Sequence, residues 1–200
     1  MKYLCRILLI LGLLSSSGML LAQDNATTLR VKLVTSAGDI TIRLYPEKSP
    51  VTVANFLAYV DSGFYNETIF HRVISNFMVQ GGGFTTAMTE KESGEPIVNE
   101  SRNKLHNIRG TIAMARTSEP DSATAQFFIN QRSNLQLDWA PGKEGYTVFG
   151  EVVKGMGVVD FIATAETDTS LMTTSSGQRP FQDVPVEAIV IKNIVRVPGK

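Results

Sequence analysis

The sequence FHRVISNFMVQGG at residues 70–82 sets two short apolar runs on either side of a polar pair, Ser75-Asn76. Short apolar runs that are bounded by turn residues are typical of β-strands. We therefore predict a strand over residues 68–74, a turn at Ser75-Asn76 and a second strand over residues 77–80. The glycines at 81–83 are expected to let neighbouring backbones pass closely.

Segments of the same kind recur on both sides of this stretch. Residues 29–35 and 40–45 alternate in hydrophobicity around a turn, which predicts a β-hairpin. Four further strands are expected at residues 110–115, 126–130, 147–153 and 186–197. The sequence therefore predicts a mainly β protein with eight short strands. This spacing favours a closed antiparallel β-barrel over an open sheet, because closure removes the sheet edges.

Two helices are expected to cap this barrel. Ser49-Pro50 supplies an N-cap and a proline at the first helical position, and apolar residues recur at helical spacing until Gly63. A second helix is predicted over residues 156–163, after Gly155.

Two long polar segments separate these elements. The first, residues 85–107, lies between motif-bearing strands and is expected to flank a binding groove. The second, residues 164–185, is rich in Thr and Ser and is expected to be a solvated surface loop. Because no repeat or linker interrupts the pattern, we predict a single domain over residues 23–200.

The first residues are typical of a signal peptide. Lys2 and Arg6 precede an apolar run over residues 7–14, and small residues follow. The run is interrupted by serines and falls short of the ~20 residues that a spanning helix needs. We expect cleavage after Ala22, with Gly18 as the alternative, and no stable membrane insertion of the mature protein. Export to the periplasm of a bacterium is the corresponding localisation.

Composition excludes several functions. Lys plus Arg and Asp plus Glu each number 19, so no basic surplus points to nucleic acid as a partner. The only cysteine, Cys5, lies in the leader, and the two histidines are isolated, which leaves no metal-ligand spacing. Neither a nucleophile elbow nor a phosphate-binding loop is present. We expect neither a metal nor a cofactor.

Three segments could carry chemistry: residues 70–82, Met114-Ala-Arg116 and Gln126-Phe-Phe-Ile129. Their order and spacing resemble the cyclophilin family of peptidyl-prolyl cis-trans isomerases, and the resemblance extends from about Leu29 to Val197. The runs at residues 121–130 and 146–156 are most similar to the periplasmic bacterial branch. The resemblance implies an enzyme that rotates X-Pro bonds and assists the folding of exported proteins.

Arg72 is the expected catalytic residue. Rotation about an X-Pro bond meets a barrier of ~18–20 kcal/mol, and no bond has to break. A donor to the prolyl nitrogen stabilises the twisted state, in which the nitrogen lone pair is localised. A guanidinium stays charged at working pH and offers several donors in a fixed fork. Because most arginines are surface or ion-pair residues, the surrounding motif is what assigns this role.

The resemblance also implies a substrate groove. Phe128 would pack on the proline ring, Met78 would complete the apolar pocket, and Gln80 would bind a substrate carbonyl beside Gln126. Gln126 and Phe128 share one face of a strand, and so do Met78 and Gln80. Phe77 has the opposite parity, so its place in the pocket requires the Ser75-Asn76 turn to rotate it. A plain core role is the alternative for Phe77 and Met78.

The far wall of the groove departs from the commonest eukaryotic pattern. Ala115 and Arg116 would offer backbone groups to the residues before proline, and Leu137 and Tyr146 would form the wall. Arg116 replaces an Asn, Tyr146 replaces a His, and Gln136 stands where those members have a Trp that meets cyclosporin. Weak cyclosporin binding is therefore expected. For Trp139 we favour a structural role in its loop over substitution for that Trp.

Two other functions remain open. A non-catalytic chaperone or adaptor could hold Pro-containing segments in the same groove, although holding a peptide does not require a donor at the prolyl nitrogen. A barrel that carries a small apolar ligand is the more remote hypothesis, since bulky inward residues leave little room. The expected partners are unfolded or flexible Pro-containing polypeptides, and the expected state is a monomer.

Overall fold

A computed structural model describes residues 29–198 of the chain. The expected signal peptide, residues 1–22, lies outside the described residues. Across the described residues, every helix is too short or too polar to cross a membrane.

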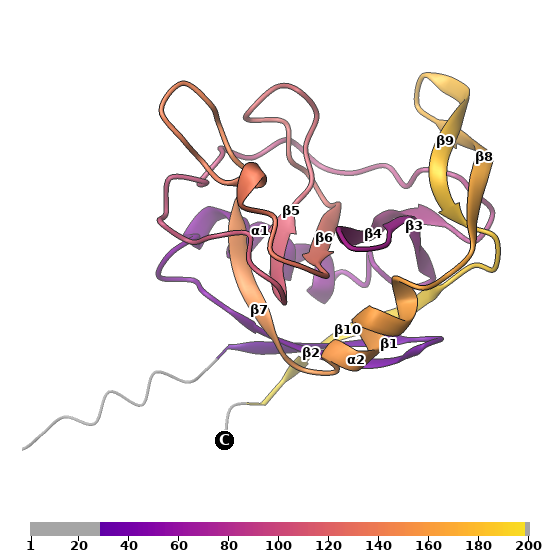
Figure 1. Cartoon of the computed structure of the whole chain (residues 1–200), viewed down its shortest axis with the longest axis horizontal. Coiled ribbons are helices and arrows are strands. Elements are labelled where there is room, and N and C mark those ends of the chain that lie inside the picture. The colour runs from indigo at the N-terminus through magenta and orange to yellow at the C-terminus, as the bar shows by residue number, and fades with distance from the viewer. Residues whose placement is uncertain (1–28, 199–200) are drawn as a thin grey trace, which may run out of the picture.

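Eight antiparallel strands close into a barrel, as the sequence predicts (Figure 1). In chain order these strands are β1 (Arg30–Thr35), β2 (Gly38–Leu44), β3 (Thr68–Ile74), β4 (Met78–Thr85), β5 (Thr111–Met114), β6 (Phe127–Asn130), β7 (Val148–Lys154) and β10 (Val190–Val197). Around the barrel the order is β1-β10-β3-β4-β6-β5-β7-β2. The strand predicted over residues 77–80 is longer than expected and runs through the glycines to Thr85. The last strand begins at Val190 rather than at residue 186.

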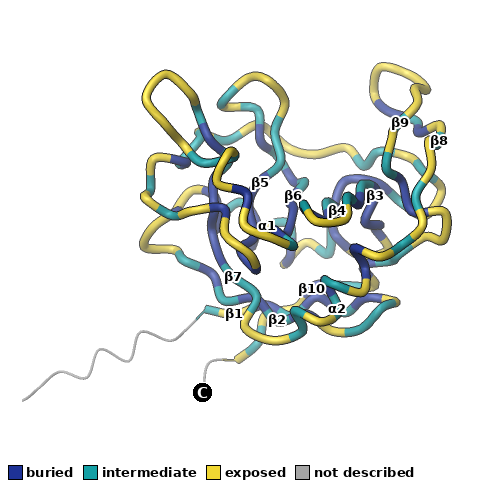
Figure 2. The backbone as a smooth tube through the Cα atoms, viewed as in Figure 1, coloured by how far each residue is buried: buried dark blue, intermediate teal, exposed yellow. Residues whose placement is uncertain are grey.

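Side chains fill the interior of the barrel. Val31, Leu33, Ile40 and Ile42 are fully buried on the inner face of the first hairpin. Figure 2 shows that buried backbone is concentrated in the barrel strands and that exposed backbone lies in the connecting loops. Because the interior is occupied, a binding site must lie on the outer wall.

The two predicted helices are α1 (Pro50–Asp61) and α2 (Met156–Ile162). Helix α1 buries its apolar face in the core, where the ring of Phe56 lies 5.1 Å from that of Phe149 and 5.8 Å from that of Phe127. Aromatic pairs at such distances stabilise a core beyond the area that they bury.

The N-terminus of α1 is capped by a residue distant in sequence. Ser49 occupies the N-cap position as predicted, but its hydroxyl donates to the carbonyl of Val148 (2.8 Å). The carboxylate of Glu100 accepts instead from the backbone N–H of Val51 (3.2 Å) and of Thr52 (2.9 Å). A carboxylate at this end also interacts favourably with the helix dipole. Glu100 therefore fixes part of the first polar segment to the start of α1.

The second polar segment is not the surface loop that we predicted. It forms a two-stranded hairpin of β8 (Thr167–Thr174) and β9 (Gly177–Pro185), which projects beside the barrel (Figure 1). Met172 and Val184 are buried, and they pack with Ile69 and Phe84 of the barrel. These two apolar residues, among β-branched threonines, give the hairpin a buried face that the overall polarity of the segment conceals.

Replacement of Glu100 by Ala should lower the free energy of unfolding by about 1–2 kcal/mol, because two helix N–H groups lose their acceptor. Denaturant unfolding of the Glu100→Ala variant measures this loss. Glu95→Ala is the matched control, since Glu95 is an exposed residue of the same segment. Equal destabilisation by the two substitutions would contradict a capping role for Glu100.

Candidate active site

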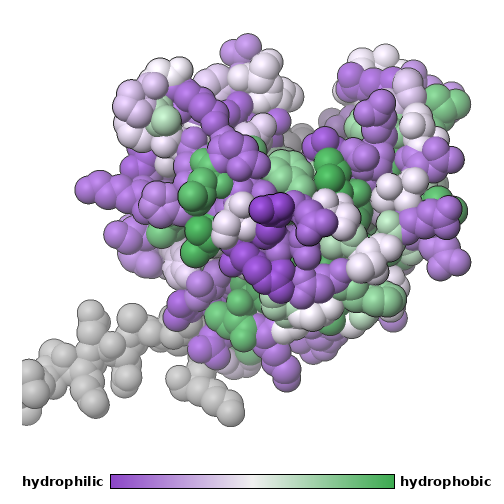
Figure 3. All heavy atoms as spheres, in the orientation of Figure 1, coloured by the Kyte–Doolittle hydropathy of each residue, from purple (hydrophilic) through white to green (hydrophobic). Residues whose placement is uncertain are grey.

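A cavity of about 390 Å³ opens on the outer wall of the barrel. All ten residues that the sequence predicts for the site line it: Arg72, Phe77, Met78, Gln80, Ala115, Arg116, Gln126, Phe128, Leu137 and Tyr146. His71 and Phe181, which sequence reasoning missed, line it as well. Figure 3 shows the surface hollowed between the β8–β9 hairpin and the loops across from it. The role of each lining residue remains a prediction.

The floor of the cavity is apolar. Met78 and Phe128 are 2% and 4% exposed, and they pack with Ala113 and Val148 beneath the cavity. Phe77 reaches the same cavity because Asn76 adopts a left-handed conformation (φ 55°), which turns the chain just before β4. Asparagine tolerates this conformation better than most residues. The cavity therefore offers an apolar surface that is suited to a small ring.

Buried asparagines hold the rim in place. The side-chain N–H groups of Asn134 donate to the carbonyl of Phe77 (2.9 Å) and to Oδ1 of Asn130 (2.8 Å). The backbone N–H of Asn134 donates to the carbonyl of Asn107 (2.7 Å). This cluster ties the turn before β4 to the segment that leads into the short 3-10 helix η1 (Leu135–Leu137). Sequence reasoning missed it, and a possible signal was Asn130 at the end of the apolar run of β6.

Three polar side chains form a chain along one side of the cavity. The amide nitrogen of Gln80 donates to Oε1 of Gln126 (3.0 Å) and lies 3.4 Å from Nε2 of His71. His71 is 2% exposed, and burial lowers its pKa to about 4. A neutral imidazole can accept the second N–H of Gln80. A substrate carbonyl would therefore have to displace one of these partners to reach the Gln80 amide.

Gly83 makes room for Gln126. A Cβ atom at residue 83 would lie 2.5 Å from Cγ of Gln126, closer than side-chain carbons approach one another. The sequence predicts close packing at the glycines of residues 81–83, and at Gly83 the group that packs closely is the side chain of Gln126, which lines the cavity. This glycine indirectly fixes where Gln126 lies.

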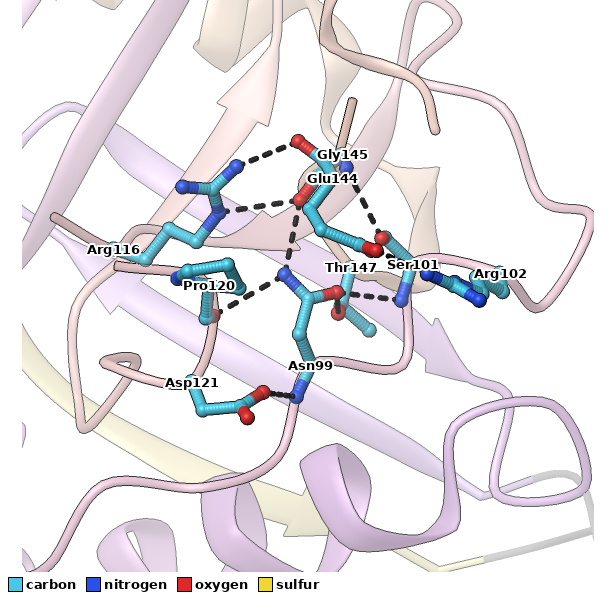
Figure 4. A network of polar contacts seen from close by, with 9 residues as sticks. All are labelled: Asn99, Ser101, Arg102, Arg116, Pro120, Asp121, Glu144, Gly145 and Thr147. Carbon is cyan, nitrogen blue, oxygen red and sulfur yellow. Dashed lines mark hydrogen bonds and ion pairs between the residues drawn. The ribbon is translucent and has the colours of Figure 1, made fainter. Parts of the chain in front are cut away.

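The far wall depends on Arg116 in a way that the sequence did not suggest. The Arg116 guanidinium lies over the ring of Tyr146, 4.5 Å from its centroid, and that ring packs edge-on against Phe128 (5.6 Å). Arg116 also donates to the carbonyls of Gly145 (3.2 Å) and Glu144 (2.7 Å) (Figure 4). We expected Arg116 to contribute backbone groups, and its side chain in addition fixes the loop that carries Tyr146.

Asn99 also forms hydrogen bonds to the loop that carries Tyr146 (Figure 4). Its side-chain nitrogen donates to the carbonyls of Gly145 (3.1 Å) and Pro120 (3.3 Å), and its Oδ1 accepts from Thr147 (3.2 Å). The first polar segment is therefore bonded to two loops that border the site. One of its residues, Glu90, also lines a smaller cavity of about 200 Å³ together with Gln80 and Gln126.

Arg72 projects from β3 at the rim of the cavity. Its side chain is 43% exposed, and its Nε lies 3.6 Å from a carboxylate oxygen of Asp183 on β9. Within residues 29–198, Asp183 is the one acidic residue that lies close enough to Arg72 to form an ion pair with it. The charged Arg72 guanidinium, a hydrogen-bond donor, therefore lies at the edge of the apolar floor that Met78 and Phe128 form.

Other features bear on ligands. Among the described residues no group of His, Cys, Asp and Glu is arranged to hold a metal ion.

Trp139 lines a different cavity, where the Arg102 guanidinium lies 5.3 Å from its ring centroid. The ring therefore lies away from the candidate site cavity, and its structural role stays a prediction.

The depressed pKa of His71 should make stability depend on pH. The unfolded chain binds a proton at this residue below pH ~6.5, whereas the folded protein resists protonation until pH falls to about 4. Stability should therefore fall as pH drops through this window, by at most about 3 kcal/mol.

The His71→Phe variant should lack this component, while His106→Gln, which changes an exposed histidine, should retain it. Urea unfolding of the three proteins at several pH values measures the difference. Parallel pH profiles for wild type and His71→Phe would contradict the assignment.

Comparisons with known proteins agree with this geometry. The family model described as cyclophilin type peptidyl-prolyl cis-trans isomerase/CLD matches residues 30–195. The chain is 53% identical over 167 residues to peptidyl-prolyl cis-trans isomerase A of Dickeya dadantii (strain 3937), covering 84% of each chain. It is 51% identical over 164 residues to peptidyl-prolyl cis-trans isomerase B of Escherichia coli (strain K12), covering 80% of this chain and 94% of the relative.

A solved structure shows the same fold. The crystal structure of a cyclophilin type peptidyl-prolyl cis-trans isomerase from Cryptosporidium parvum superposes with a TM-score of 0.69 at 27% identity, covering 86% of this chain and 99% of that one. The region that the family model matches runs from the start of β1 into β10 and includes the strands that build the cavity. The chain therefore belongs to the cyclophilin-type peptidyl-prolyl cis-trans isomerase family.

Proposed function

We propose that this protein catalyses rotation about X-Pro bonds in unfolded or flexible segments of exported proteins, and that Arg72 is its catalytic residue. The observation that carries the proposal is the position of the Arg72 guanidinium at the rim of a cavity with an apolar floor, which includes Met78 and Phe128. Membership of the isomerase family supports the reaction, and the cavity supports the assignment of roles.

The proline ring binds on the apolar floor, where burial of its methylene groups anchors one side of the rotating bond. The chain on the other side of the bond is free to turn. Gln80 then gives up one of its internal hydrogen bonds to hold a substrate carbonyl. These contacts orient the substrate before the bond rotates, which lowers the entropic part of the barrier.

The Arg72 guanidinium donates to the prolyl nitrogen as the bond twists. In the planar ground state the lone pair of that nitrogen is delocalised into the carbonyl, so it is a poor acceptor. In the twisted state the lone pair is localised and accepts the hydrogen bond. The contact is therefore stronger in the transition state than in the ground state, which is the condition for catalysis. Neither a metal nor a cofactor takes part.

The setting of this activity is the bacterial periplasm. Residues 1–22 have the features of a signal peptide, and the relatives with about half of their residues identical are bacterial. Uncatalysed prolyl isomerisation takes tens of seconds, slow enough to limit folding, so exported chains gain from a catalyst. We further propose that the protein acts as a monomer. Weak cyclosporin binding is also proposed, because Gln136 replaces the Trp of the eukaryotic pattern.

Substitution of Arg72 by Ala should reduce kcat/KM at least about tenfold, a loss of ~1.4 kcal/mol or more of transition-state stabilisation. A protease-coupled assay on an X-Pro peptide measures it. Arg30→Ala, which removes an exposed arginine from β1, is the matched control and should leave kcat/KM unchanged. Phe128→Ala should lower kcat/KM by removing part of the apolar floor.

If the wild type is no more active than Arg72→Ala but binds the peptide, the enzymatic proposal is wrong and a chaperone or adaptor remains. Peptide binding by both proteins, measured by NMR titration, separates these outcomes.

The form recovered from the periplasm should begin at Gln23, because cleavage after Ala22 removes the leader. N-terminal sequencing of the exported protein checks this. A start at Met19 would instead indicate cleavage after Gly18. A Leu9→Arg variant, which puts a charge into the apolar run, should not be exported. Recovery of a periplasmic protein that still begins at Met1 would contradict the proposed signal peptide.

A further inference from the structure

The β8–β9 hairpin reaches into the candidate active site. Phe181 of β9 lines the same cavity as Arg72, and Asp183, two residues later, forms the ion pair with that arginine. The mechanism above makes no use of either residue. A segment that looks like a solvated loop in the sequence therefore supplies side chains to the site.

An irregularity in the hairpin directs Asp183 toward Arg72. Asp168 pairs with Val184 and Ser170 pairs with Phe181, so Thr169 of β8 stands opposite two residues of β9, Gln182 and Asp183. This arrangement is a β-bulge. Asp183 adopts a left-handed conformation (φ 60°) within it. Bulges of this kind are frequent next to active sites, where they change the direction in which a side chain points.

The hairpin is attached firmly enough to hold Asp183 in place. Met172 and Val184 are buried against the barrel, and the ring of Phe181 packs edge-on against Phe84 (5.3 Å). On the other strand, the backbone N–H of Thr173 donates to the carbonyl of Met88 (2.9 Å). The carboxylate therefore comes from a fixed element.

The contact engages one edge of the guanidinium. The Asp183 oxygen lies beside Nε of Arg72, and the two terminal nitrogens carry four further N–H groups. An arginine side chain has many rotamers, and each one that points away from the cavity is unproductive. A carboxylate on the Nε edge favours the rotamers that keep the guanidinium at the rim while its terminal donors stay available.

We propose that Asp183 is a positioning residue that holds the Arg72 guanidinium over the cavity, and that the bulged β8–β9 hairpin exists in part to present it. This inference rests on the proposed function of Arg72. Asp183 acts through Arg72 and touches no reacting atom. It should therefore affect turnover rather than substrate binding.

The Asp183→Asn variant tests the proposal. Asparagine keeps the size of the side chain and tolerates the left-handed conformation, so the bulge should persist while the charge is lost. We expect kcat to fall about two- to fivefold, the range for a partly exposed ion pair, with KM unchanged. Asp168→Asn is the matched control. It removes a carboxylate from the other strand of the same hairpin, where the side chain accepts from the backbone N–H of Thr169.

The dependence of turnover on ionic strength distinguishes an electrostatic role of Asp183 from a purely structural one, because salt screens only the electrostatic effect. With an uncharged X-Pro peptide, the ratio of wild-type to Asp183→Asn turnover should shrink toward one at about 1 M salt, where the screening length is ~3 Å. The Asp168→Asn ratio should stay near one throughout. Thermal unfolding of both variants checks that the hairpin remains folded.

The outcomes separate the two proposals. An active wild type, an Arg72→Ala variant that is at least about tenfold less active, and a slower, salt-sensitive Asp183→Asn support both. Wild-type turnover by Asp183→Asn, faster turnover, or a loss that salt does not reduce would overturn the positioning role and leave the role of Arg72 intact. A wild type no faster than Arg72→Ala would overturn the proposed function itself.

Discussion

The register of four adjacent strands determines the site. Arg72 of β3 pairs with Gln80 of β4, Gln80 pairs with Phe128 of β6, and Phe128 pairs with Ala113 of β5. These pairings form a row across the outer wall in which the charged donor, the amide and the aromatic ring are neighbours. A slip of one residue in any strand would turn its members of the row toward the filled interior. The packed core therefore serves the site, because it permits only one register.

Polar bonds from distant segments then fix the walls around this row. The Asn134 amide holds the turn that carries Phe77, and Asn99 and Arg116 hold the loop that carries Tyr146. Arg72, Gln80 and Phe128 thus come from strands, whereas the residues that form and orient the rim come largely from segments without regular structure. Hydrogen bonds to backbone carbonyls suit this purpose, because they do not depend on the side chain at the supported position.

Much of the barrel and the composition of the cavity were predictable from the sequence. Period-two patterns and turn residues located the eight strands, and the family resemblance selected ten residues that line one cavity. The hairpin was not predicted, since its polar composition hides a buried face that includes the apolar residues Met172 and Val184. His71 and Asp183 were missed for a different reason. Their places depend on burial and on a bulge, which tertiary packing creates and local sequence does not reveal.

The proposals assign different tasks to the parts of the site. The strand row would supply the donor and the apolar floor, the loops would shape the far wall, and the hairpin would position the arginine. NMR exchange spectroscopy of an X-Pro peptide with a catalytic amount of protein tests the central claim most directly. Spontaneous exchange takes roughly tens to hundreds of seconds, so cis-trans cross-peaks at mixing times of about one second require catalysis. The account predicts strong cross-peaks with the wild-type protein, and spectra identical to those of the free peptide would contradict it.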